Sequence, residues 1–95
     1  MKIYDHDLQL IEYLSERLGC SICQLMIHTR RRDIVDRRHV LMWWLREREI
    51  WTYRYIASIF GMEHATVIHA VKKVQDLCNI RDKSIIGLIK QLEDE

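Results

Sequence analysis

The chain has 95 residues, of which 48% are hydrophobic, and its 15 Lys and Arg nearly balance its 14 Asp and Glu. This composition indicates one globular domain and excludes a mainly disordered chain, which would have fewer apolar residues and a larger net charge. Three glycines and no proline also exclude a turn-rich β fold and a glycine-rich loop that binds nucleotide phosphates.

The cellular location is predicted from signals that the sequence lacks. The first residues contain no apolar segment typical of an export signal, and the longest apolar run, residues 40–45, is far shorter than the ~20 residues of a membrane span. Three cysteines, an odd number, argue against a disulfide scaffold. We therefore expect a cytoplasmic protein with no membrane partner.

The small net charge of +1 hides an uneven distribution along the chain. Residues 30–54 carry eight basic and four acidic side chains, whereas residues 1–29 carry two basic and four acidic ones, and residues 76–95 carry three and five. A basic centre between two acidic ends is compatible with a nucleic-acid partner if the basic groups share one face.

Two helices are predicted in residues 1–29. The first spans residues 7–18, is capped by Asp5 or Asp7 and ends before Gly19. A second, short helix opens with the capping box Ser21-x-x-Gln24. The apolar residues at helical spacing in these two segments are Leu8, Ile11, Leu14, Leu18, Ile22, Leu25 and Met26.

A long helix is predicted after the basic residues Arg30 to Arg32. It runs from Ile34 or Arg37 to Arg48, and Asp33 or Asp36 is expected to cap its start. Its apolar residues at helical spacing are Val40, Leu41, Trp44 and Leu45.

Three more helices complete the chain. Thr52 is the expected N-cap of a helix over residues 53–60, Gly61 ends that helix, and the next begins near His64. The last helix is expected over residues 83–92. The predicted inward residues are Ile56, Ile59, Phe60, Val67, Val71, Val74, Leu77 or Cys78, Ile85, Ile86, Ile89 and Leu92. The predicted fold class is therefore all-α, a compact bundle of five to six helices.

The helices that meet at Gly61 have the spacing of a helix-turn-helix. Ala57 lies where the second helix must approach closely, and Val67 can seal the pair from the other side. The outer face of the second helix would then present Thr66, His69 and Lys73 to a DNA groove, with Glu63 and His64 at its start. The alternative is an ordinary αα-hairpin within a small bundle.

Residues 60–74 read Phe-Gly-Met-Glu-His-Ala-Thr-Val-Ile-His-Ala-Val-Lys-Lys-Val. This stretch resembles the signature of the C-terminal DNA-binding domain of the bacterial replication initiator DnaA, Phe-Gly-Gly-Arg-Asp-His-Thr-Thr-Val-x-His-Ala. The similarity extends from the first helix to the last, so residues 1–95 would form one such domain. It implies a variant helix-turn-helix in a Trp-repressor-like fold.

The resemblance implies a role for individual residues on DNA. Glu63 and His64 match the residues that read bases, and Arg30 matches the arginine that enters the minor groove. Thr66, Arg38, His39 and Arg46 match residues that contact the backbone. Together with the positions that surround them, the implied DNA-binding set is Arg30, Arg38, His39, Arg46, Thr52, Glu63, His64, Ala65, Thr66, His69, Lys72 and Lys73.

Three departures from the family pattern affect these expectations. The turn after Phe60 is one residue shorter, and Ala65 stands where the family has its first base-contacting threonine, so the DNA site read here is expected to differ. The ATPase module of the full initiator is missing, so this chain is expected neither to hydrolyse ATP nor to melt DNA. We favour a free-standing small protein over an excised domain.

Other residue groups favour structural roles. Cys20 and Cys23 form a Cys-x-x-Cys without a second ligand pair at zinc spacing, so we expect two small buried side chains and no bound metal. Trp43, Trp44 and Trp51 could stack on single-stranded bases, but their positions favour the core or a patch that faces a partner. No set of residues indicates an enzyme, and no cofactor is expected.

The sequence thus predicts sequence-specific binding of double-stranded DNA by a monomer, in replication initiation or its regulation. The recognition helix would lie in the major groove and Arg30 in the minor groove. The alternative is a protein-interaction module that binds a replication protein through Met42, Trp43 and Trp51.

Overall fold

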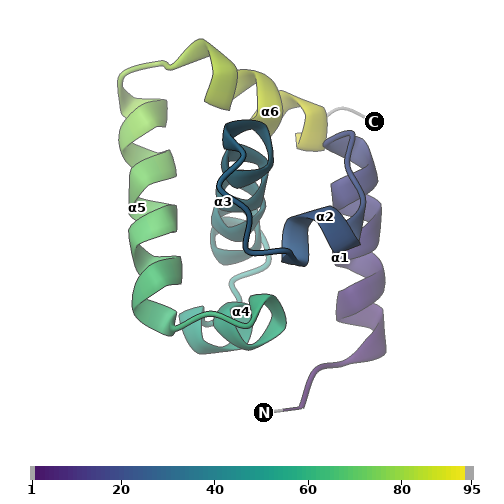
Figure 1. The fold of residues 1–95 in the computed structure, drawn as a ribbon. Helices are drawn as coiled ribbons and strands as arrows, with labels where there is room; N and C mark the ends of the chain where they lie inside the picture. Colours follow the sequence, from purple (N-terminus) through teal and green to yellow (C-terminus); the bar gives the residue numbers. More distant parts are fainter. Residues whose placement is uncertain (1, 94–95) are drawn as a thin grey trace.

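Six helices and no strand make up residues 2–93, the part of the chain that the computed structural model describes. They are α1 (Asp5–Arg17), α2 (Ile22–Met26), α3 (Arg32–Glu47), α4 (Tyr53–Phe60), α5 (His64–Asn79) and α6 (Lys83–Glu93) (Figure 1). The predicted all-α class and the helix-turn-helix are confirmed. None of the helices within these residues is both long and apolar enough to cross a membrane.

The long helix α3 lies in the centre of the fold. It packs against α2, α4, α5 and α6, and Figure 1 shows it between α5 on one side and α1 on the other. A helix with neighbours on several sides buries more than one stripe, so Met42 (0% exposed) and Trp43 (9%) join the core beside Val40, Leu41 and Leu45. Trp44, which was expected on the core stripe, is only partly buried.

The burial of Met42 and Trp43 removes the surface predicted for the alternative function, a protein-interaction module. Neither residue can form a patch that faces a partner, because both lie in the core. The indole Nε1 of Trp43 donates a hydrogen bond to Gln75 Oε1 at 3.3 Å, which links α3 to α5. Trp51 is also partly buried and meets Tyr55 edge-on. All three tryptophans therefore pack in or against the core.

Four helix boundaries agree with their local signals. Ser21 and Gln24 form both bonds of the predicted capping box, and the Thr52 side chain accepts a hydrogen bond from the N–H of Tyr55 at 3.1 Å. Gly19 and Gly61 follow helix ends with φ of +79° and +64°, in the left-handed region that glycine enters without a Cβ clash.

The predicted aspartate caps of α1 and α3 are wrong. These helices begin earlier, after Tyr4 and Arg31, and neither N-cap residue makes a side-chain cap bond. Asp5, Asp7 and Asp33 instead lie in the first turns, where the partial positive charge of the helix end favours carboxylates. Asp7 also accepts a hydrogen bond from the hydroxyl of Tyr55, which ties α1 to α4.

Two smaller predictions also change. In α6, Leu88 is buried in the place expected for Ile86, together with Ile85, Ile89 and Leu92. Cys20 is half-buried, and Cys23 is exposed, so the prediction that both side chains are buried is wrong for Cys23. Burial raises the pKa of the Cys20 thiol, and Arg37 partly opposes this change. Within residues 2–93, no three metal-ligating side chains lie together.

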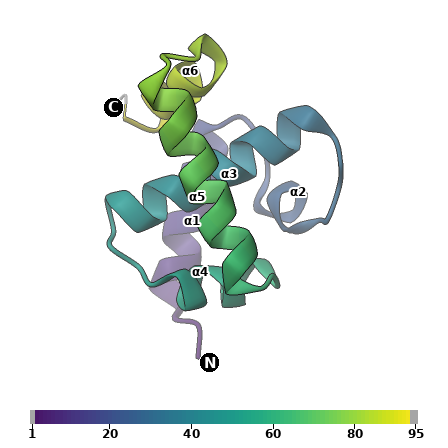
Figure 2. The same cartoon turned by 90° about the vertical axis from the view of Figure 1, so that its left-hand side faces the viewer.

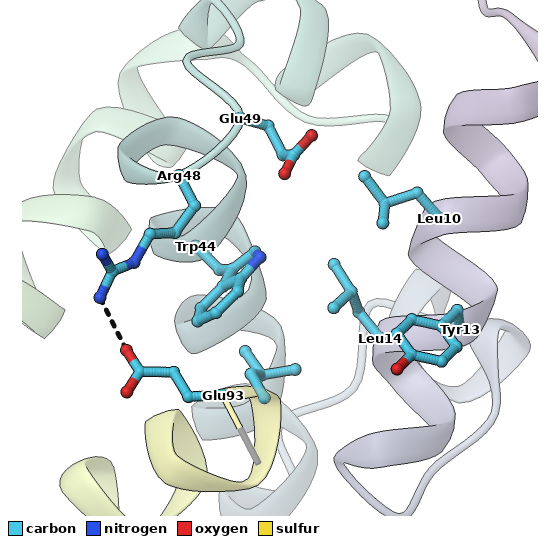
Figure 3. A pocket seen from close by; sticks show the side chains of 8 residues that line it. Leu10, Tyr13, Leu14, Trp44, Arg48, Glu49 and Glu93 are labelled. Atoms are coloured by element: carbon cyan, nitrogen blue, oxygen red, sulfur yellow. Dashed lines mark hydrogen bonds and ion pairs between the residues drawn. The ribbon is translucent and has the colours of Figure 1, made fainter. Parts of the chain in front are cut away.

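A surface hollow of about 530 Å³ lies between α1, α6 and the end of α3. Leu10, Tyr13 and Leu14 line one wall, Trp44 lies opposite, and an ion pair between Arg48 and Glu93 (2.7 Å) closes the rim (Figure 3). Because α1 and α5 lie on opposite sides of α3, this hollow lies away from α5.

Candidate nucleic-acid interface

The helix-turn-helix is held together by an apolar seal between α4 and α5. Gly61 ends α4 in the left-handed conformation, and the N–H of Met62 donates to the Ala57 carbonyl at 3.0 Å. This turn leads directly into Glu63, the N-cap of α5. The buried residues of the pair are Ile56, Ala57 and Phe60 on α4 and Val67, Ala70, Val71 and Val74 on α5. The packing roles predicted for Ala57 and Val67 are confirmed.

The opposite face of α5 is exposed and mostly polar. Figure 2 looks onto this helix, which crosses in front of α3, with α4 near its N-terminal end. The side-chain carboxylate of Glu63 forms no cap bond, so it is available at the start of the helix. The exposed predicted site residues on and beside α5 are Glu63, His64, Ala65, Thr66, His69, Lys72 and Lys73.

Arg30 lies in the loop between α2 and α3. It is exposed, and the neighbouring turn is held by a hydrogen bond from the N–H of Arg31 to Thr29 Oγ1 at 3.2 Å. In Figure 2, α2 and this loop lie to one side of α5 rather than behind it. In this view α5 therefore does not cover the loop.

Arg38 has a different environment from the one that the family resemblance implies. Its side chain is 4% exposed, and its guanidinium donates to the carbonyls of Leu25, at 2.8 Å, and of Ile27. Burial lowers the pKa of this guanidinium. The arginine thus joins the end of α2 to α3 from inside the fold, and it does not belong to the exposed face.

His39 and Arg46 lie on α3 with part of each side chain accessible. The His39 Nδ1 atom is buried and forms no hydrogen bond within the described residues. Burial lowers the pKa of His39, and the positive charges of Lys73 and Arg38 lower it further. Arg46 donates to the Trp51 carbonyl at 3.1 Å and lies over the Tyr53 ring at 4.4 Å.

A further basic residue on this side of the molecule was missed from the sequence. Arg54 is exposed on α4 and lines the same surface depression as His64. It has no counterpart in the quoted motif, which starts at Phe60. The available signal was a cation in the first turn of a helix, a position where basic residues are disfavoured.

Comparison with known proteins places this architecture in a family. The family described as the bacterial DnaA protein helix-turn-helix matches residues 9–74. The chain is 28% identical over 88 residues to the chromosomal replication initiator protein DnaA of Thermus thermophilus, an alignment that covers 92% of the chain and 20% of that protein.

Two further initiators of the same name are similar. The Mycoplasma pneumoniae protein is 30% identical over 83 residues, or 87% of this chain and 19% of that protein. The Pelobacter propionicus protein is 29% identical over 91 residues, or 94% of this chain and 20% of that protein. The chain spans about a fifth of the length of the curated relatives it matches.

Proposed function

The chain belongs to the bacterial DnaA helix-turn-helix family, and from this premise we propose that it binds double-stranded DNA in a sequence-specific manner. The relatives are named chromosomal replication initiator proteins. The proposed role is accordingly in replication initiation or its regulation, at a site like an initiator box.

The observation that carries this proposal is the division of α5 into two faces. Its apolar face is buried, mainly against α3 and α4, while its opposite face is exposed and mostly polar. An α-helix fits the major groove of B-DNA, which is about 12 Å wide. In the proposed complex the carboxylate of Glu63 accepts from a cytosine N4 and His64 packs on a thymine methyl group, as their exposed positions at the start of α5 allow.

Backbone and minor-groove contacts complete the proposed complex. Thr66, Lys72 and Lys73 would contact phosphates beside the major groove. Arg46 uses one N–H on the Trp51 carbonyl, and a guanidinium has five, so donors remain for a phosphate. Arg30 would enter the adjacent minor groove from its exposed loop, where narrow A·T-rich steps attract arginine.

Fluorescence anisotropy with two labelled duplexes tests this function. One duplex carries an initiator-type box and the other a scrambled sequence, both at about 150 mM salt, where charges beyond ~8 Å are screened. We expect binding to the box alone, with a slope of log K against log salt of about −4 to −5 for four to six phosphates. Equal affinity for both duplexes would call for a selection from random duplexes, and the absence of any preferred sequence in that selection would contradict the proposal.

Variants identify the contact residues. His64→Ala and Arg30→Ala should each weaken box binding by about tenfold, since each removes a contact to a base edge or groove. Lys90→Ala removes an exposed positive charge from α6, a helix that Figure 1 shows at the opposite end of the fold from α4, and should leave affinity unchanged. If neither His64→Ala nor Arg30→Ala changes the affinity, the assigned residues are wrong.

We also propose that the chain binds DNA as a monomer. Analytical ultracentrifugation at assay concentrations tests this oligomeric state.

A further inference from the structure

Arg54 occupies an unfavourable position in α4. It is the second residue of the helix, where the free N–H groups of the first turn carry a partial positive charge. Its side chain is exposed, and its guanidinium makes no hydrogen bond or ion pair with any residue from 2 to 93. A cation at this place weakens the helix, so the requirements of folding do not explain it.

A surface depression of about 220 Å³ connects Arg54 to the start of α5. Ala57 and Met62 supply its apolar, more deeply placed wall, whereas Arg54, Ser58 and His64 are exposed and polar. Arg54, Ala57 and Ser58 share one face of α4, because residues three and four apart lie together on a helix. One nucleotide of a DNA backbone is complementary to this depression, because its sugar has an apolar face and its phosphate, next to the sugar, is anionic.

We propose that Arg54 binds a backbone phosphate of duplex DNA, with the adjoining deoxyribose seated in the depression beside His64. This proposal rests on the proposed function and names a contact that the family motif does not include. When the second helix of a helix-turn-helix enters the major groove, the first helix crosses the DNA backbone. Arg54 and His64 line one depression, so a single strand can meet both side chains.

The chemistry of arginine suits this contact. A guanidinium presents a planar fork of donors to two phosphate oxygens, and it remains charged at every physiological pH. The positive end of α4 then repels Arg54 in the free protein and adds to the attraction for the phosphate in the complex. The position is thus unfavourable for the helix alone and favourable once DNA is bound.

A salt titration of box binding gives the first test. Arg54→Ala should reduce the magnitude of the salt slope by about 0.9, the loss of one phosphate contact, and weaken binding about tenfold. Arg54→Lys keeps the charge and should restore the slope. Lys90→Ala removes one exposed charge from α6 and should leave the slope unchanged. An unchanged slope in Arg54→Ala would overturn the proposal.

A neutral-backbone scan locates the phosphate. Each phosphate of the box is replaced in turn by a methylphosphonate, and the affinities of the wild type and Arg54→Ala are compared. At one position the methylphosphonate should weaken binding of the wild type but leave the affinity of Arg54→Ala unchanged. At every other position where the replacement weakens binding, it should weaken binding of both proteins. An identical set of sensitive phosphates would overturn the contact while leaving DNA binding established. Failure of the wild type to bind any duplex would overturn both proposals. Circular dichroism confirms that each variant is folded.

Discussion

Arg38 is the one charged side chain that is buried among the described residues. Its guanidinium donates two hydrogen bonds, to the backbone carbonyls of Leu25 and Ile27 at the end of α2. These carbonyls lie where the helix ends, so no following turn of α2 supplies N–H donors for them. A buried carbonyl without a partner costs free energy comparable to a lost hydrogen bond. The stability of the α2–α3 junction therefore depends on this guanidinium.

We expect Arg38→Met to lower the free energy of unfolding by about 2–3 kcal/mol, because methionine retains much of the apolar volume but no donor. Urea denaturation measures this change. Arg32→Met is the control, since Arg32 is 80% exposed and its pair with Asp36, at 3.4 Å, is worth little. Equal losses in the two variants would show that the buried bonds do not matter.

His39 is expected to make stability depend on pH. Its folded pKa lies below the usual 6.5, so below pH 6.5 the unfolded chain binds a larger fraction of a proton at this imidazole than the folded chain does. The free energy of unfolding should therefore fall as the pH decreases from about 7.5 through 6.5. His39→Gln should show a smaller fall between the same pH values. The same fall in both proteins would assign the effect elsewhere.

The sequence does not distinguish two arginines of α3 that the structure places in different environments. The family resemblance gives Arg38 and Arg46 similar roles on one helix, but only the packing of α2 shows that one guanidinium is enclosed and the other partly accessible. Burial depends on elements distant in sequence. The exposed residues of α5 were easier to place, because the buried valines on the same helix determine which side faces outward.

At the scale of helices, boundaries with local signals were predictable. The Ser21 box, the Thr52 cap and the two glycines act through bonds or dihedral angles within a few residues. The start of α1 was not predictable in this way, because Asp7 serves a partner 48 residues away, the hydroxyl of Tyr55. A carboxylate engaged elsewhere does not need to act as a cap.

Two glycine substitutions should have opposite effects. Gly61→Ala should cost about 1–2 kcal/mol, because alanine is strained at a φ of +64° even though no atom lies near its added Cβ. Gly87→Ala should raise stability by about 0.5–1 kcal/mol, since Gly87 is inside α6 and its Cβ would also meet no neighbour. Thermal unfolding compares the two. Stabilisation by Gly61→Ala would contradict the role of the left-handed turn.

At the scale of the whole molecule, α3 connects the helices. Periodicity alone suggested one buried stripe, and the true number of buried faces became visible only with α2, α4, α5 and α6 in place. This is why Met42 and Trp43 were misplaced on a surface patch. The all-α class needed no such knowledge, because it follows from the spacing of apolar residues within each helix.

The central position of α3 predicts cooperative unfolding. No large part of the core can open without exposing residues of α3, so helices should not melt separately. In urea, tryptophan fluorescence reports on Trp43 and Trp44 of α3 and on Trp51 before α4, and far-ultraviolet circular dichroism reports on all helices. The two signals should give one superimposable transition. Two separated midpoints would show that part of the fold is independent.

The anchoring of Ile27 by Arg38 has a consequence for the length of DNA that the domain reads. Arg30 follows the anchored residue by three positions, so its Cα can lie at most about 10 Å from that of Ile27. In the proposed complex the length of this linker limits the distance between the minor-groove contact and the major-groove contacts. One inserted residue would lengthen it by about 3.5 Å, close to the roughly 3.4 Å rise of one base pair. We therefore expect domains of this family with longer or shorter linkers to prefer boxes whose A·T-rich end is displaced by whole base pairs.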